Sequence, residues 1–202
     1  MLKNRIITAL AIAFVALAAI FLLPLWAFSL FFLAAAGFGV FEWAGFAGLE
    51  TLRAKLLYTG LFLLMAAGLY LLKAYFADFI GLVSMLWMCA IASILLYPTG
   101  EFLFKNQWFV GALGLVIMLG AWVSLSMLRA HDQGALWLVW LFVLTTATDV
   151  GAYFVGKAFG KNRLAAQLSP GKTWEGAIGG CVIATLICAS ALMFWQSYSL
   201  LS

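Results

Sequence analysis

The sequence predicts an all-α protein, a polytopic transmembrane helical bundle with about seven spans that forms a single integral-membrane domain over residues 1–202. Composition supports this fold class, since 67% of the 202 residues are hydrophobic and only 9% are charged. A soluble domain is about half apolar and about a quarter charged, so this chain has too little polar surface to cover a globular core. The apolar residues form long runs rather than alternating segments of about ten residues, which argues against a transmembrane barrel.

Seven apolar segments are long enough, or nearly so, to cross a hydrocarbon layer about 30 Å thick at about 1.5 Å per helical residue. Only Pro24 separates the first two segments, which is typical of a tight turn or a kinked re-entry. The first segment is too long for the core of a typical signal peptide, so we expect it to be a retained membrane helix. The segments lie at about residues 6–23, 25–49, 56–72, 79–97, 108–128, 135–156 and 177–195.

The placement of the cations predicts the orientation. If the N-terminus is cytoplasmic and every segment crosses, nine of the eleven Lys and Arg residues lie on the cytoplasmic side, and only Lys73 and Arg129 lie on the far side. The positive-inside rule favours this arrangement. We therefore expect the N-terminus and the polar loop at about 157–176 to face the cytoplasm, where CTP and ATP are available.

Two carboxylates fall inside predicted spans, Glu42 in the second and Asp149 in the sixth. A charged side chain that faces lipid costs at least a few kcal/mol, so each is expected to face the bundle interior or a wet cavity. Each lies seven residues before the predicted end of its span, about 10 Å below the cytoplasmic end, where both can line one cavity. Alternatively, Asp149 pairs with a cation at the helix end, and Glu42 orients Trp43 or pairs with Arg53 or Lys55.

The stretch from Thr148 to Gly176 carries four of the eleven cations and two of the seven acids. Its glycines allow close backbone approach to a ligand, and its cations can neutralise phosphate oxygens. The start of the following helix presents free N–H groups to an anion. Glu175 in that first turn suits the helix dipole and can equally hold Mg²⁺. The stretch therefore predicts a phosphate and metal site, and the simpler alternative is a basic cytoplasmic loop.

The sequence Gly171-Lys172-Thr173 looks like the end of a P-loop, but the likeness fails. The glycine required five positions earlier is Ala166, and no strand is predicted before the loop. A P-loop nucleotidase is therefore excluded.

Two motifs resemble a known family. Residues 148–161 read TDVGAYFVGKAFGK and residues 169–176 read SPGKTWEG. Together they resemble the bacterial phosphatidate cytidylyltransferases, also called CDP-diacylglycerol synthases. The opening residues 2–9 and the segment 42–44 are similar to the same family.

The resemblance implies an Mg²⁺-dependent enzyme of the bacterial cytoplasmic (inner) membrane that condenses CTP with phosphatidic acid to CDP-diacylglycerol and pyrophosphate. The implied partners are these substrates and the lipid bilayer, without nucleic acid. Asp149 becomes the candidate metal-associated acid, and Glu175 is a tentative second metal ligand. The candidate catalytic residues are Asp149, Lys172 and Glu175. The candidate substrate-binding residues are Lys157, Lys161, Arg163, Ser169, Gly171, Thr173 and Trp174.

The chain also departs from the family pattern. Members of the family are longer and carry a second signature with Pro-Gly-His-Gly-Gly and an Asp-Arg-x-Asp run, whereas the single histidine here is His131. We therefore expect a truncated or shortened member that lacks part of the metal site, and whether the chain is active alone stays open at this point.

Two other functions stay open at this point. One is a CTP-dependent polyprenol or phytol-type lipid kinase, and the other is a non-catalytic membrane subunit or transporter. The oligomeric state also stays open, because the pairs Gly156/Gly160 and Gly176/Gly180 allow close helix packing either within one chain or across a homodimer.

Overall fold

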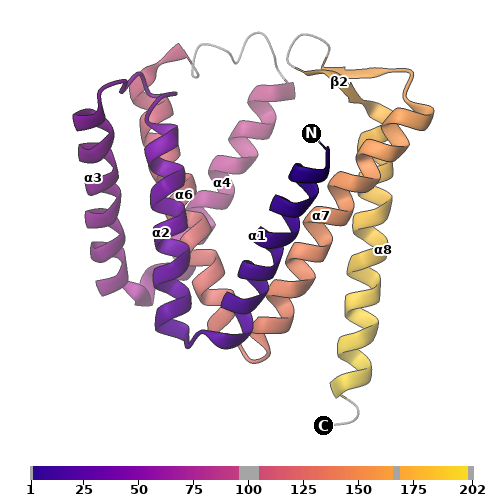
Figure 1. Ribbon diagram of the computed structural model, residues 1–202, viewed down its shortest axis with the longest axis horizontal. Helices are drawn as coiled ribbons and strands as arrows, with labels where there is room; N and C mark the ends of the chain where they lie inside the picture. The colour runs from indigo at the N-terminus through magenta and orange to yellow at the C-terminus, as the bar shows by residue number, and fades with distance from the viewer. Residues whose placement is uncertain (1, 96–104, 166–168, 200–202) are drawn as a thin grey trace. The chain divides into compact units, whose positions relative to one another are not determined.

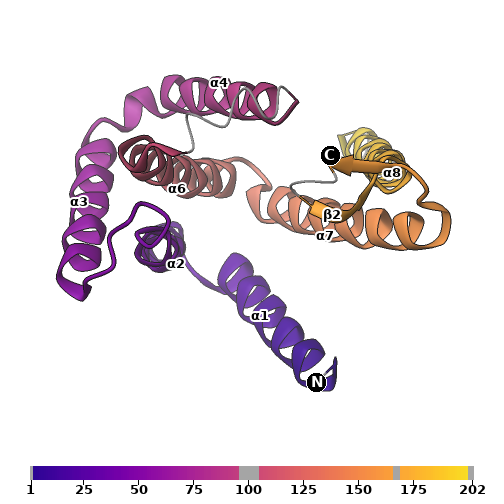
Figure 2. The same ribbon diagram turned by 90° about the horizontal axis from the view of Figure 1, so that it is seen from above.

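The computed structural model describes residues 2–95, 105–165 and 169–199 (Figures 1 and 2). This part of the chain is mainly helical, with one short strand pair, so the predicted helical membrane fold is confirmed. Six of its helices are long and apolar enough to cross a membrane, while the apolar part of the first, Ile7–Leu22, is shorter. The elements are α1 (Leu2–Leu22), α2 (Leu25–Trp43), α3 (Leu52–Leu71), the 3-10 helix η1 (Lys73–Tyr75), α4 (Phe76–Leu95), α6 (Gln107–Ala130), α7 (Gly134–Phe159), β1 (Arg163–Ala165), β2 (Ser169–Thr173) and α8 (Trp174–Ser199).

The predicted end of the second span at residue 49 is wrong. Helix α2 ends at Trp43, and turns occupy the next five residues. The amide of Leu49 donates to the carbonyl of Ala44 over 2.9 Å, which closes the turn. Gly48 has a φ of 74°, a backbone conformation that glycine adopts readily. The glycines therefore end the helix although the apolar run continues.

The chain divides into two compact units, residues 1–134 and 135–202. Unit 1 contains α1, α2, α3, η1, α4 and α6, and unit 2 contains α7, the strand pair and α8. That the chain forms one integral-membrane domain stays a prediction.

The core of unit 1 lies between α2, α3 and α6. Fully buried Val40, Phe62 and Val123 come from these three helices. Between membrane helices such side chains stabilise the contact by van der Waals packing, because lipid tails are as apolar as they are. The apolar interior therefore sets how these helices pack, and polar side chains then fix their ends.

Polar contacts within unit 1 show that α2 and α6 run antiparallel. At the end of α2, Trp43 Nε1 donates to the carbonyl oxygen of Val110, near the start of α6, over 2.9 Å. At the start of α2, the carbonyl oxygen of Ser29 accepts from Nε1 of Trp122, late in α6, over 3.1 Å. Each indole thereby satisfies its only donor on a backbone carbonyl.

Arg129 ties the end of α1 to this assembly. Its Nε donates to the carbonyl oxygen of Ile20 over 3.0 Å, and its guanidinium lies 5.9 Å from the ring centroid of Phe28. A cation at the end of a helix suits the unsatisfied carbonyls and the negative end of the dipole. One of the two cations predicted on the far side therefore also caps a helix.

The two ends of unit 1 carry different cations, as the topology prediction requires. Tyr58 Oη donates to the carbonyl of Gly111 over 2.6 Å, so the start of α3 lies beside the start of α6. Arg53 and Lys55 lie at that end, whereas Arg129 lies in the last turn of α6 at the opposite end. Which end faces the cytoplasm stays a prediction.

Unit 2 consists of α7 and α8 side by side, with the strand pair at one end of them (Figures 1 and 2). Strands β1 and β2 are antiparallel, with Arg163 opposite Thr173. This hairpin was not predicted and replaces part of the expected loop. A Cβ added at Gly176 would lie only 2.8 Å from the carbonyl oxygen of Ala152, so glycine is what allows α8 to approach α7 here.

The second predicted glycine pair, Gly176 and Gly180, lies where α8 packs against Ala152 of α7. A Cβ at Gly180 would lie 3.2 Å from Cβ of Ala152. Gly176 and Gly180 therefore serve close helix packing within the chain. A homodimer stays a prediction.

Candidate active site

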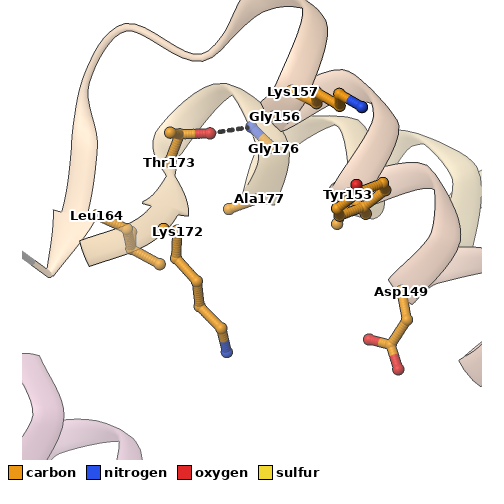
Figure 3. A pocket seen from close by; sticks show the side chains of 11 residues that line it. Asp149, Tyr153, Gly156, Lys157, Leu164, Lys172, Thr173, Gly176 and Ala177 are labelled. Atoms are coloured by element: carbon orange, nitrogen blue, oxygen red, sulfur yellow. Dashed lines mark hydrogen bonds between the residues drawn. The ribbon is translucent and has the colours of Figure 1, made fainter. Parts of the chain in front are cut away.

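Unit 2 contains a pocket of about 590 Å³ between α7, the hairpin and the start of α8 (Figure 3). All of its lining residues belong to this unit. They are Asp149, Ala152, Tyr153, Gly156, Lys157, Leu164, Gly171, Lys172, Thr173, Gly176 and Ala177.

The wall supplied by α7 follows from helical periodicity. Its lining residues recur at steps of three, one, three and one along the chain, which places them on one face of a helix. This face presents a carboxylate, an aromatic ring and an ammonium group in succession, from Asp149 through Tyr153 to Lys157. The opposite wall is β2 and the first turn of α8, which supply Lys172 and backbone.

Asp149 and Lys172 direct their charged ends into the same open space from opposite sides of the pocket (Figure 3). The structure therefore brings together the two residues on which the sequence prediction rests most. The predicted depth of Asp149 is corrected, however. Helix α7 continues to Phe159, so Asp149 lies ten residues before its end, or about 15 Å along the helix axis.

Tyr153 is a pocket residue that the sequence prediction of the site missed. Its ring lies 5.9 Å from Nζ of Lys157, a distance that allows a cation–π contact. The signal that finds it is its spacing, four residues after Asp149 and four before Lys157, which places all three on adjacent turns of one helix face.

Thr173 lies where β2 passes into α8. Its Oγ1 accepts a hydrogen bond from the amide of Gly176 over 3.2 Å, drawn as the dashed line in Figure 3. The hydroxyl thus satisfies one of the unpaired amides at the start of α8. Thr173 was predicted to bind substrate. The structure places it at the pocket and also gives it this capping contact.

Glu175 has partners other than the predicted metal. Its carboxylate accepts from the amide of Lys161 over 3.2 Å, from the amide of Asn162 over 3.2 and 3.3 Å, and from Nδ2 of Asn162 over 2.9 Å. It does not line the pocket. Within the described residues, no group of three or more His, Cys, Asp or Glu side chains could hold a metal ion. The catalytic and metal roles of Glu175 stay predictions that this geometry does not support.

Four further candidates lie outside the pocket lining, namely Lys161, Arg163, Ser169 and Trp174. Trp174 instead lines a second, apolar groove of about 400 Å³ along α8. Their substrate-binding roles stay predictions.

Glu42 lies in the last turn of α2 and is exposed, so its predicted depth of seven residues within the span is wrong. The indole of Trp43 is held by a backbone carbonyl, and Lys55 lies over the Phe41 ring at 5.4 Å. Among the described residues, no ion pair joins Glu42 to Arg53 or Lys55. Because Glu42 and Asp149 belong to different units, their shared cavity stays a prediction.

Comparison with known proteins identifies the family. Residues 3–201 match the profile of the Cytidylyltransferase family. A phosphatidate cytidylyltransferase of Pseudomonas aeruginosa is 38% identical over 180 residues, which covers 89% of this chain and 66% of the relative. The phosphatidate cytidylyltransferase of Haemophilus influenzae is 33% identical over 206 residues, covering 93% of this chain and 71% of the relative.

A third relative, the phosphatidate cytidylyltransferase of Bacillus subtilis, is 35% identical over 104 residues, covering 48% of this chain and 39% of the relative. The chain thus spans about two thirds of the length of the first two relatives. No solved structure gives a significant match. Because the family profile covers nearly all of its residues, the chain belongs to the cytidylyltransferase family.

Proposed function

We propose that this chain acts as a phosphatidate cytidylyltransferase, with the pocket of unit 2 as its active site. In the proposed reaction, an oxygen of the lipid phosphate bonds to the α-phosphorus of CTP. The bond from that phosphorus to the oxygen bridging to the β-phosphate breaks, and pyrophosphate leaves with its electron pair. CDP-diacylglycerol is the product. The family and the names of the relatives support this reaction.

One observation carries the proposal from the side of the structure. Lys172 and Asp149 reach into one pocket where a basic hairpin joins two long apolar helices. CTP, a soluble nucleoside triphosphate, and a lipid phosphate are both anions, so a site that joins them needs a cation between them. The position at a helix end supports a meeting place for a membrane lipid and a soluble nucleotide.

Lys172 is proposed to contact phosphate oxygens of the substrates. Its ammonium is a compact charge on a flexible stem, so it can follow the phosphate as charge develops during the transfer. Lys157 on the α7 wall adds a second positive charge. Its Nζ lies 5.9 Å from the ring centroid of Tyr153, another residue that lines the pocket.

Asp149 fits an Mg²⁺ ion that arrives with the nucleotide. Mg²⁺ is commonly bound by one or two protein carboxylates together with substrate phosphates, and the pocket offers one carboxylate. When bound, the ion would offset negative charge on the phosphates. Asp149 would hold it through a carboxylate oxygen, and Lys172 would balance the remaining charge.

The proposed setting is the cytoplasmic membrane of a bacterium, with the N-terminus and the hairpin on the cytoplasmic side. The six long apolar helices and the bacterial relatives support a multi-pass membrane protein. The count of nine cations against two supports the orientation.

Labelled CTP tests the reaction. Membranes that contain the protein are incubated with phosphatidic acid and CTP labelled at either the α- or the γ-phosphate, and lipids are separated by thin-layer chromatography. We expect the α-label in CDP-diacylglycerol and no γ-label in lipid. Transfer of the γ-label to a lipid alcohol would instead indicate a CTP-dependent lipid kinase. Lipid labelling equal to that of the Lys172→Ala variant would contradict the proposal.

A further inference from the structure

Asn162, between α7 and β1, is held at three of its polar groups by the start of α8. Its amide and its Nδ2 both donate to the carboxylate of Glu175, the latter over 2.9 Å. Its carbonyl oxygen accepts from the amide of Trp174 over 2.9 Å. A single residue at the base of the hairpin is thereby fixed to α8 on both its donor and its acceptor sides.

Glu175 is the centre of this arrangement. The neighbouring amide of Lys161 also donates to its carboxylate over 3.2 Å, so one charged group satisfies three donors from two consecutive residues. Hydrogen bonds to an ionised acceptor are roughly twice as strong as neutral ones. Helix α7 ends at Phe159 and β1 begins at Arg163, so these two amides lie between the two elements. The Glu175 carboxylate supplies the hydrogen-bond acceptor for them.

From these contacts we propose that Glu175 is a positioning residue that locks the β1–β2 hairpin onto α8 and so holds Lys172 at the pocket. Arg163, the first residue of β1, pairs with Thr173, and Lys172 directly precedes Thr173 in β2. Fixing Asn162 therefore fixes the register at the base of the hairpin. The attachment of the hairpin to α8 through Glu175 is argued from geometry alone. The role of Lys172 in substrate binding, which this attachment would support, rests on the function proposed above.

This role differs from that of a metal ligand. Both carboxylate oxygens of Glu175 accept hydrogen bonds from backbone and side-chain N–H groups, and Glu175 is not among the residues that line the pocket. The pocket carboxylate is Asp149. The two acids of the motif thus have different roles. Glu175 positions the hairpin, and Asp149 contacts the ligand.

Limited trypsin digestion tests the lock without any assumption about the reaction. Lys161 and Arg163 flank the locked turn and are trypsin sites. In Glu175→Ala we expect cleavage at these two sites to be about tenfold faster than in the parent chain, because several charge-assisted hydrogen bonds are lost. Glu50→Ala is the matched control, because it removes an exposed carboxylate from the α2–α3 connection in unit 1, and it should cleave like the parent.

Steady-state kinetics then tests the effect on Lys172. Glu175→Gln keeps the side-chain length and one acceptor oxygen but places an NH₂ group against the amides. We expect it to raise the KM for CTP about tenfold at an unchanged Mg²⁺ concentration for half-maximal activity. A lower folded fraction alone would reduce the apparent kcat and leave KM unchanged.

Two results would overturn the proposal. One is a parent-like cleavage rate in Glu175→Ala, which would show that the carboxylate does not lock the turn. The other is a shift of the Mg²⁺ requirement in Glu175→Gln as large as that in Asp149→Asn, which would make Glu175 a metal ligand. A parent protein without CTP turnover would defeat the proposed function, and the digestion would still decide on the lock.

Discussion

At the scale of single residues, Asp149 is a carboxylate within the long, mainly apolar helix α7, where an acid is costly unless it faces the protein interior or a wet site. Its neighbours on the same helix face are Tyr153 and Lys157, and Lys172 enters from the opposite wall. Its surroundings therefore support a role toward a cation that accompanies the substrate.

Replacement of Asp149 by Asn tests that role with little change of shape. We expect Asp149→Asn to raise the Mg²⁺ concentration needed for half-maximal activity by roughly tenfold or more, because the ion loses a charged oxygen ligand. Glu50→Gln is the control, since Glu50 is an exposed acid of the α2–α3 connection for which no site role is predicted. An Mg²⁺ titration of both variants gives the comparison, and equal curves for Asp149→Asn and the parent would contradict the assignment.

Thr173 connects the pocket with the stability of α8. We expect Thr173→Val to lower the free energy of unfolding by about 0.5–2 kcal/mol, because the amide of Gly176 loses its acceptor. Thr173→Ser keeps the hydroxyl and should retain most of the stability. Thermal unfolding in detergent measures both, and a Thr173→Val variant as stable as Thr173→Ser would show that the cap contributes nothing.

At the scale of elements, the crossing of α7 and α8 decides the shape of the pocket. A Cβ at Gly176 would meet the Ala152 carbonyl oxygen at 2.8 Å and Thr173 Oγ1 at 3.1 Å, so a neighbour must shift. We expect Gly176→Ala to cost about 1–3 kcal/mol of stability. Gly171→Ala is the matched control, because a Cβ at Gly171 meets nothing within 4 Å. Detergent unfolding curves should separate the two variants, and equal losses would argue against this crossing.

The sequence predicts helices better than it predicts the hairpin, for a physical reason. Long apolar runs announce spans by composition alone. The strands of the hairpin are short, and β2 contains Pro170 and Gly171, which are typical turn residues. Their pairing depends on contacts such as Glu175 with Asn162, which are thirteen residues apart and follow no local period.

The end of α2 and the choice of pocket residues show the same limit. Residues 44–49 continue an apolar run, so composition extends the helix that Gly48 actually helps to end. Within the motif, charge and spacing select Asp149 and Lys172, which line one pocket, and their catalytic roles stay predictions. Charge and spacing cannot tell that Glu175 turns to the backbone of the hairpin, because that depends on the three-dimensional position of Asn162.

At the scale of the whole molecule, unit 1 is a packed group of apolar helices and unit 2 carries the pocket. The topology prediction requires successive helices to run in opposite directions, and the contacts inside unit 1 agree with this. They place Arg53 and Lys55 at one end of the unit and Arg129 at the other. The predicted orientation in the membrane rests on the side at which these cations are retained.

Cysteine labelling in spheroplasts tests the orientation. In a background without the three native cysteines, we expect Asp132→Cys, between α6 and α7, to react with a membrane-impermeant maleimide in intact spheroplasts. Glu50→Cys, between α2 and α3, should react only after permeabilisation. Both positions are exposed, so access depends on the side of the membrane. The reverse pattern would invert the topology and place the pocket away from cytoplasmic nucleotides.

The most direct test of the central claim is equilibrium binding of CTP to the purified chain in the presence of Mg²⁺. Lys172→Ala removes the cation that enters the pocket, whereas Lys161→Ala removes a cation of the same motif that lies outside the pocket lining. Loss of a charge-assisted contact to phosphate corresponds to about a tenfold change in Kd or more. We predict such a rise in Kd for Lys172→Ala and a much smaller change for Lys161→Ala. Equal affinities of the Lys172→Ala variant and the parent would contradict the claim that this pocket holds the nucleotide.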